Sequence, residues 1–201
     1  LKEAADSPYL PSRYHRLRAE TDKRLGETKL EGLLDEASGC EAAGDEDAAL
    51  SGYRQALALE PSCEIAAEKV GELEARLARN AGLTWLGRGD TALGAGNFDD
   101  AVHGYYMAVT RDHGLAASGG DGEVLFELVR EFREDVGKVP DRAQAAALSA
   151  LYRAHQELQR ENLPGSQLEV RRAGGLAESL PTGRSIGNRL KNLREAEGHE
   201  R

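Results

Sequence analysis

Two stretches of sequence decide the fold, GDEDAALSGYRQAL at residues 44–57 and GNFDDAVHGYYMAV at residues 96–109. Gly, Ala, Gly, Tyr and Ala recur in them at the same offsets. The first Gly permits a tight turn between two helices, and the small Ala residues allow those helices to approach closely. Tyr53 and Tyr105 each follow the first shared Ala by four residues, which places Ala and Tyr on one helical face. The sequence therefore predicts an internal repeat of antiparallel helix pairs, spaced 52 residues apart.

The composition of the 201-residue chain favours helices throughout. Leu and Ala number 27 and 30, whereas Val and Ile together number ten and aromatic residues make up 5%. Sheets are built from β-branched and aromatic residues, while Leu, Ala, Glu and Arg are good helix formers. We therefore expect an all-α fold of antiparallel helix pairs, and a β-sandwich, a barrel or a large parallel sheet is excluded.

Pro, Gly and capping residues mark the expected boundaries. Gly26 is expected to end a first helix, and Thr28 with Glu31 to open the next one as a capping box. Asp141 and Gln144 form a similar cap later in the chain. The expected regions are an N-terminal lead-in and helix at 1–27, the repeat region at 28–113, an additional helical pair at 114–163, and a tail at 164–201 that is irregular over 165–187 and carries a short basic helix.

The two units resemble the tetratricopeptide repeat family, in which a first helix with Trp, Leu, Gly and Tyr precedes a second helix with Ala, Phe and a later Pro. The second helix of each unit fits this pattern, whereas the first helix departs from it. The resemblance implies a fragment of an α-solenoid built from helix pairs. The matching positions are Ala49, Tyr53, Ala56 and Pro61 in the first unit and Trp85, Gly89, Ala101, Tyr105 and Ala108 in the second.

The two units are spaced more widely than the family's period of about 34 residues. The excess of about 18 residues equals about five α-helical turns, which keeps the apolar face in phase. We therefore expect a long central helix over 62–95, either continuous or divided into two nearly collinear helices near Asn80-Ala81-Gly82.

The resemblance also implies a function, because such repeats hold a peptide or a helix of a partner on a concave face formed by their first helices. Residues 31–60 carry eight Asp/Glu and one Arg, so a basic or amphipathic protein or peptide suits this face. We therefore expect a non-catalytic scaffold for protein–protein interaction. The groove positions carried over from the family are Leu34, Ser38 and Glu41 in the first unit and Leu86, Asp90 and Leu93 in the second.

Other interpretations stay open. The chain is a structural or oligomerisation element if the helix at 62–95 pairs with a second copy, as a homodimer or in a larger assembly. It is an enzyme or a regulatory domain if the segment 165–187 holds a site. Trp85 either packs between helices or is an exposed aromatic anchor for a peptide. The basic C-terminal segment either frays or docks on a partner, on the acidic part of the chain or on an anionic membrane.

Signatures of catalysis, cofactor binding and metal binding are missing from the sequence. Residues 87–92 fit the Gly-x-Gly-x-x-Ala dinucleotide pattern, but helical patterns flank them where a strand is required. No two His residues have the spacing of a helical zinc site. Cys40 is expected to be a small core residue and Cys63 a turn residue. We therefore expect no enzyme and no cofactor.

The bulk properties bound the partners and the compartment. A net charge of −9 argues against nucleic acid as a partner. No apolar run approaches the length of about 20 residues that a membrane span needs. The sequence begins at Leu1 rather than Met, which is consistent with a processed form or an excised region of a longer protein. We expect a soluble chain, with the cytoplasm as the favoured compartment.

Overall fold

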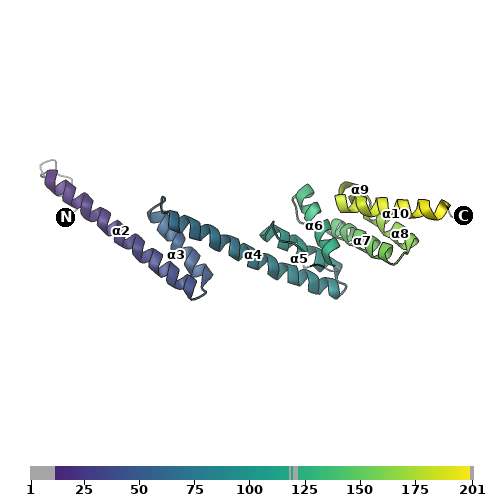
Figure 1. Ribbon diagram of the computed structural model, residues 1–201, viewed down its shortest axis with the longest axis horizontal. Helices are drawn as coiled ribbons and strands as arrows, with labels where there is room; N and C mark the ends of the chain where they lie inside the picture. The colour runs from purple at the N-terminus through teal and green to yellow at the C-terminus, as the bar shows by residue number, and fades with distance from the viewer. Residues whose placement is uncertain (1–11, 118, 120–121, 200–201) are drawn as a thin grey trace. The chain divides into compact units, whose positions relative to one another are not determined.

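The computed structural model describes residues 12–117, 119 and 122–199, and every regular element within these residues is an α-helix (Figure 1). The all-α prediction is therefore confirmed. The chain divides into two compact units, Leu1–Leu77 and Ala78–Arg201. The division falls inside a helix, so that one helix contributes residues to both units.

Two helical hairpins with the same element lengths follow one another in the chain. The first consists of α2 (Ser12–Ala42) and α3 (Glu46–Leu59), and the second of α4 (Glu64–Gly94) and α5 (Phe98–Arg111). Both first helices have 31 residues and both second helices have 14. Every boundary recurs after 52 residues, which is the offset of the sequence repeat. The long helix predicted over 62–95 is confirmed, in its continuous form, as α4.

The turns of the two hairpins have the same backbone conformation. Gly44 and Gly96 have φ of +81° and +76°, a left-handed conformation that Gly adopts without strain. The side chains of Asp45 and Asn97 then cap the second helices by accepting from the backbone N–H three residues later. The turn chemistry thus repeats together with the helix lengths.

The helices of each hairpin meet at small residues. Gly52 of α3 lies against Ala37 of α2, and Gly104 of α5 lies against Gly89 of α4. A Cβ atom on Gly52 would lie 2.8 Å from the Cβ of Ala37, and one on Gly104 would lie 2.8 Å from the Cα of Gly89. No larger side chain fits at these contacts. The Ala residues that the repeat shares are also buried: Ala49, Ala56, Ala101 and Ala108.

Each unit has its own hydrophobic core. In unit 1, Ala37 of α2 and Leu50 and Tyr53 of α3 pack with Ala66 and Leu73 from the first half of α4. This core therefore joins three helices, of which α4 supplies only the part up to Leu77.

The core of unit 2 is larger. It is built from the second half of α4, from α5, and from α6 (Gly122–Val136), α7 (Arg142–Gln159), α8 (Leu163–Ala173), α9 (Leu176–Ser179) and α10 (Pro181–His199). Tyr105 and Phe126 are fully buried at its centre, with ring centroids 5.7 Å apart in an edge-to-face arrangement. The predicted capping box of Asp141 and Gln144 opens α7, as expected.

A carboxylate of α6 fixes the start of α10. The backbone N–H of Thr182 donates to both carboxylate oxygens of Glu131, at 3.1 and 3.0 Å, and the Thr182 hydroxyl donates to one of them at 2.7 Å. Negative charge stabilises a helix N-terminus. Ile186 and Leu190 then bury one face of α10 in the core. Within the described residues, which end at 199, the basic C-terminal segment therefore packs against the core of unit 2.

The predicted break at Gly26 is wrong. The helix α2 continues through this residue, and the Thr28 hydroxyl donates to the carbonyl of Arg24 at 3.0 Å instead of capping a new helix. A single Gly inside a helix costs about 1 kcal/mol, which flanking interactions can offset. Ion pairs between Lys23 and Glu27 and between Arg24 and Glu20 bracket the position. Residues 12–27 are thus continuous with the first helix of the hairpin.

The prediction that residues 165–187 are irregular is also wrong, whereas the basic helix predicted after them is present as part of α10. Residues 165–187 belong mostly to α8, α9 and α10, and α10 alone has 19 residues. Pro164 and Pro181 lie in the first turns of α8 and α10, where Pro favours helix initiation. Gly183 lies inside α10 because the backbone of α9 approaches it too closely for a side chain. These Pro and Gly residues therefore start and pack helices instead of breaking them.

We expect Gly104→Ala to lower the free energy of unfolding by about 1–3 kcal/mol, because the new methyl group would overlap backbone atoms that cannot rotate away. The matched control is Gly87→Ala in α4, where a Cβ meets no other atom. That change should raise the free energy of unfolding by about 0.5–1 kcal/mol. Urea denaturation followed by circular dichroism measures both. Equal stability of the two variants would contradict the close contact.

Candidate partner-binding surface

The first hairpin places its three predicted groove residues along one side of α2. Ser38 is exposed, whereas Leu34 and Glu41 are half-buried. Leu34 packs on the core of unit 1. Glu31 and Asp35 continue the same side at helical spacing and are exposed. This side of α2 therefore combines two exposed carboxylates and a hydroxyl with one accessible apolar residue.

Glu41 is engaged by cations and by a phenol. Its carboxylate lies 3.6 Å from the ammonium of Lys69 and 3.6 Å from the guanidinium of Arg76, both on α4. It also accepts a hydrogen bond from the Tyr53 hydroxyl at 3.3 Å. The interpretation of Glu41 as a groove residue needs correction, because its carboxylate is already paired with two cations of α4.

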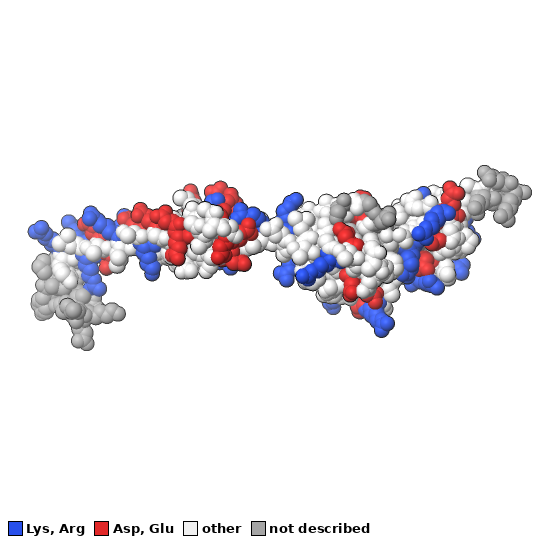
Figure 2. All heavy atoms as spheres, turned by 90° about the horizontal axis from the view of Figure 1, so that it is seen from below, with Lys and Arg blue, Asp and Glu red and all other residues white. Residues whose placement is uncertain are grey.

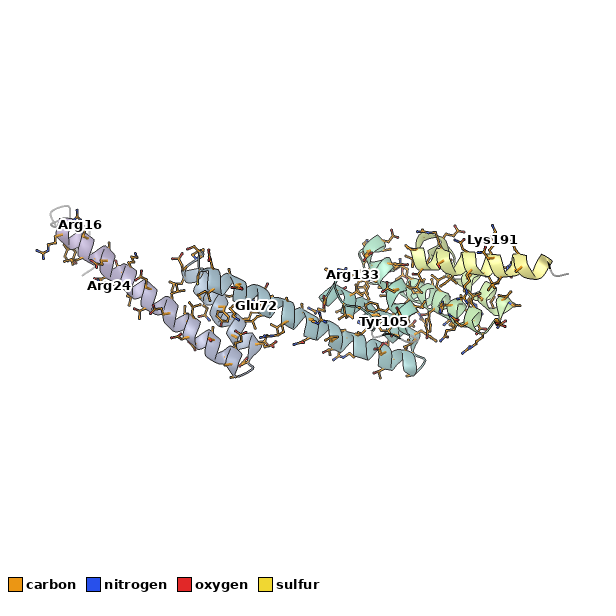
Figure 3. The ribbon with its side chains drawn as sticks, viewed as in Figure 1. Arg16, Arg24, Glu72, Tyr105, Arg133 and Lys191 are labelled. Atoms are coloured by element: carbon orange, nitrogen blue, oxygen red, sulfur yellow. The ribbon has the colours of Figure 1, made fainter. Side chains whose placement is uncertain are left out.

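The second hairpin repeats the phenol–carboxylate contact with other residues. The hydroxyl of Tyr105, which Figure 3 labels, donates to the carboxylate of Asp90 at 2.7 Å across the α4–α5 pair. Asp90 is exposed and Leu93 is half-buried. The start of α6 lies beside all three, since a Cβ on Gly122 would contact Tyr105, Asp90 and Leu93. Asp90 is therefore accessible on one side only.

Leu86 is not a groove residue. Its side chain is only 5% exposed and belongs to the core of unit 2. The error arises because the groove positions were transferred from the repeat family, whereas the first helix of this unit departs from the family pattern. Trp85 is half-buried against the same core, its ring lying 5.7 Å from that of His103 and 4.5 Å from the guanidinium carbon of Arg88. Of its two interpretations, packing between helices fits these contacts.

The two phenols have raised pKa values. Burial is the main cause for both, and the neighbouring carboxylates, Glu41 for Tyr53 and Asp90 for Tyr105, raise the pKa further. These tyrosines therefore keep their protons, and their hydrogen bonds to the carboxylates, into alkaline solution.

Sequence reasoning missed a cleft between α8 and α10, because the residues of α8 and of the start of α10 that line it were expected to be irregular. One cavity of about 510 Å³ is continuous with another of about 490 Å³ through Val170, Arg171 and Gly187, which line both. Leu190 and Ala177 add apolar surface, and the basic side chains of Arg184, Lys191 and Arg194 line it as well. The signal that could have revealed it is the spacing of Ile186, Leu190 and Leu193, which already indicated a helix there.

Other kinds of site find little support among the described residues. No three His, Cys, Asp or Glu side chains within 12–117, 119 and 122–199 are grouped to hold a metal ion. Both cysteines, Cys40 and Cys63, are free and half-buried. None of the helices in this part of the chain combines the length and the apolar character required to traverse a lipid bilayer. Comparison of the chain with protein families, curated proteins and solved structures finds no match.

We expect the ultraviolet titration of the folded chain to show tyrosines that ionise well above pH 10. Tyr105→Phe should remove the last component to ionise, and Asp90→Asn should shift it to lower pH. Because folding raises this pKa, the stability it contributes is fully present below pH 10 and is lost as the pH rises through the folded value. An unchanged titration curve in Asp90→Asn would show that the carboxylate has no influence on the phenol.

Proposed function

We propose that this chain is a non-catalytic scaffold that binds a basic, amphipathic peptide or helix of a partner protein, in the manner of tetratricopeptide repeats. The observation that carries the proposal is the exposed acidic side of α2. There Glu31, Asp35 and Ser38 are exposed beside the half-buried Leu34, at the spacing of one helical face. A cationic side chain would pair with the carboxylates while an apolar one contacts Leu34.

Charge supports this choice of ligand. Residues 31–60 carry eight acidic residues and one Arg, and acidic side chains gather over the α2–α3 hairpin in Figure 2. The α4 cations Lys69 and Arg76 pair with Glu41 and Glu46 of the hairpin. The structure leaves Glu31 and Asp35 exposed. The exposed carboxylates would attract a basic segment from a distance, with an effect that salt weakens.

The second hairpin offers a related but more apolar side. Asp90 stands 52 residues after Ser38, and Leu83, one of the exposed large apolar residues of α4, stands 52 residues after Glu31. A ligand with both charged and apolar side chains suits these two sides, each taken by itself. The half-buried Leu93 contributes further apolar surface, whereas Leu86 does not.

Self-association through the region 62–95 has weaker support. Among the described residues of α4, the large apolar side chains that are exposed are Ile65 and Leu83. The residues Glu72 and Arg76, which lie between them at helical spacing, are charged. A continuous apolar seam of the kind that pairs helices is therefore missing from that side. The oligomerisation alternative stays a prediction, and light scattering over a range of concentrations tests it.

The binding proposal is tested with a synthetic helical peptide that carries Lys and Leu at helical spacing. We expect the full chain to bind it in fluorescence anisotropy, and Ser38→Arg to weaken binding about tenfold through like-charge repulsion. Asp90→Asn, which keeps an acceptor oxygen for Tyr105, should weaken it about two- to fivefold.

Matched controls separate local from overall charge. Ser51→Arg and Asp135→Asn make the same changes at exposed positions on α3 and α6, and should leave the affinity unchanged. A peptide with Glu in place of Lys should not bind to this surface. The proposal fails if the Lys/Leu peptide does not bind, or if all four variants bind it like the unmodified chain.

A further inference from the structure

The first half of α2 has a face that is covered at the equivalent place in α4. In α4, the residues Ala66, Val70, Leu73 and Leu77 pack on the core of unit 1, where the hairpin of α2 and α3 covers them. Moving back by the repeat offset of 52 residues gives Tyr14, Arg18, Thr21 and Leu25 of α2, so the two outer positions keep an apolar residue and the two inner ones are polar. Unit 1 therefore contains the first half of α4, which the hairpin covers, and the equivalent first half of α2, which can be compared with it.

The equivalent half of α2 is bare in the described part of unit 1. Tyr14, Leu17 and Leu25 are 46%, 55% and 68% exposed. They follow one another at intervals of three and eight residues, which keeps them on one side of the helix. Among the described helices of unit 1, none accompanies α2 beyond the end of α3 (Figure 1). Three large apolar side chains on one side of an uncovered helix mark a surface that gains free energy by being covered.

Some charged residues of the two helix halves also correspond, whereas the equivalent of Lys69 is the apolar Leu17. In α4, Arg76 lies 3.6 Å from Glu41 and 2.7 Å from Glu46 of the covering hairpin. Its equivalent in α2 is Arg24, whose guanidinium pairs only within its own helix, with Glu20, in the ion pairs that the structure shows. Glu74 of α4 pairs with Arg54 of the hairpin at 2.6 Å, and its equivalent is the acidic Asp22.

We propose that the first half of α2, residues 12–27, is a docking face for an acidic helical hairpin of a partner protein. The occupant must offer carboxylates to Arg24, as Glu41 and Glu46 do to Arg76. Residues 13–30 carry six Lys/Arg and three Asp/Glu, so the face attracts an acidic occupant. Figure 2 shows this contrast as blue side chains along the first half of α2 and red ones over the hairpin, and Figure 3 labels Arg16 and Arg24 there.

A second copy of the chain is the less suitable occupant. Its own acidic hairpin is already held by Lys69 and Arg76 of its own α4. Pairing of two first halves of α2 would bring two basic surfaces together. The proposal concerns a face other than the acidic side of α2 and does not rest on the function proposed above.

The test attaches a known acidic hairpin to the face. Residues 28–63 are duplicated and joined directly to Ser12 of the chain, just as residue 63 joins Glu64 in the natural sequence. Hydrogen exchange followed by mass spectrometry then measures the amides of residues 14–25, whose peptides stay unique. We expect exchange at least about tenfold slower than in the unmodified full chain, and slower at low salt than at high salt.

Substitutions decide whether the face itself is responsible. Tyr14→Glu and Leu25→Glu in the fusion should restore fast exchange, whereas Leu83→Glu, an exposed position of α4, should not. Unchanged exchange in the fusion would overturn the proposal, whether or not the added hairpin folds. Slow exchange in the unmodified chain would also overturn the proposal. If the slow exchange depends on protein concentration, a second copy is the occupant. If deletion of residues 1–11 abolishes it, those residues are the occupant. Ser38 and Asp90 take no part, so either proposal can fail alone.

Discussion

Both hairpins depend on a contact at which one helix offers no side chain to the other. Gly104 meets the backbone of Gly89, and Gly52 meets Ala37, so the helices approach closely and bury the Ala residues on either side. The residue after each of these Gly is a Tyr, which fills the next space and reaches a carboxylate on the facing helix. Glycine, tyrosine and carboxylate thus pack as one unit. The bulky tyrosine ring fits because the glycine beside it has no side chain. The remainder of each hairpin, including the turn with its capped helix, is arranged around this contact.

Much of this arrangement could be predicted from the sequence, because close contacts accept few residue types. The offsets of Gly, Ala and Tyr indicated paired helices, and the wide spacing of the units indicated the long helix that became α4. The errors concern glycines and prolines whose role depends on distant residues. Gly26 and Gly44 were both expected to end a helix. Only Gly44 has a positive φ and follows the end of α2, whereas Gly26 lies inside that helix. Gly183 is required because the backbone of α9 lies close to it, and the periodicity of the sequence does not predict this contact.

The candidate surface on α2 stays a prediction, and the structure changes the chemistry that its residues offer. Ser38 is exposed. Glu41, however, is neutralised by Lys69 and Arg76, which lie some 28 and 35 residues further along the chain and meet it only through the fold. Burial of Leu86 likewise results from the helices that follow the hairpin, and a local motif contains no information about them. Pattern reasoning therefore finds helical faces, whereas tertiary ion pairs decide which charges on those faces are available.

The helix α4 has a consequence for how the chain would unfold. Its first half contributes Leu73 to the core of unit 1, and its second half contributes Leu86 to the core of unit 2. Loss of either core leaves half of one continuous helix without tertiary support, and a helix of that length is marginal in water on its own. The stabilities of the two units are therefore coupled through a shared element, like neighbouring sites in a one-dimensional cooperative chain. In such a chain the cooperative module is not a hairpin alone but a hairpin together with half of the next helix.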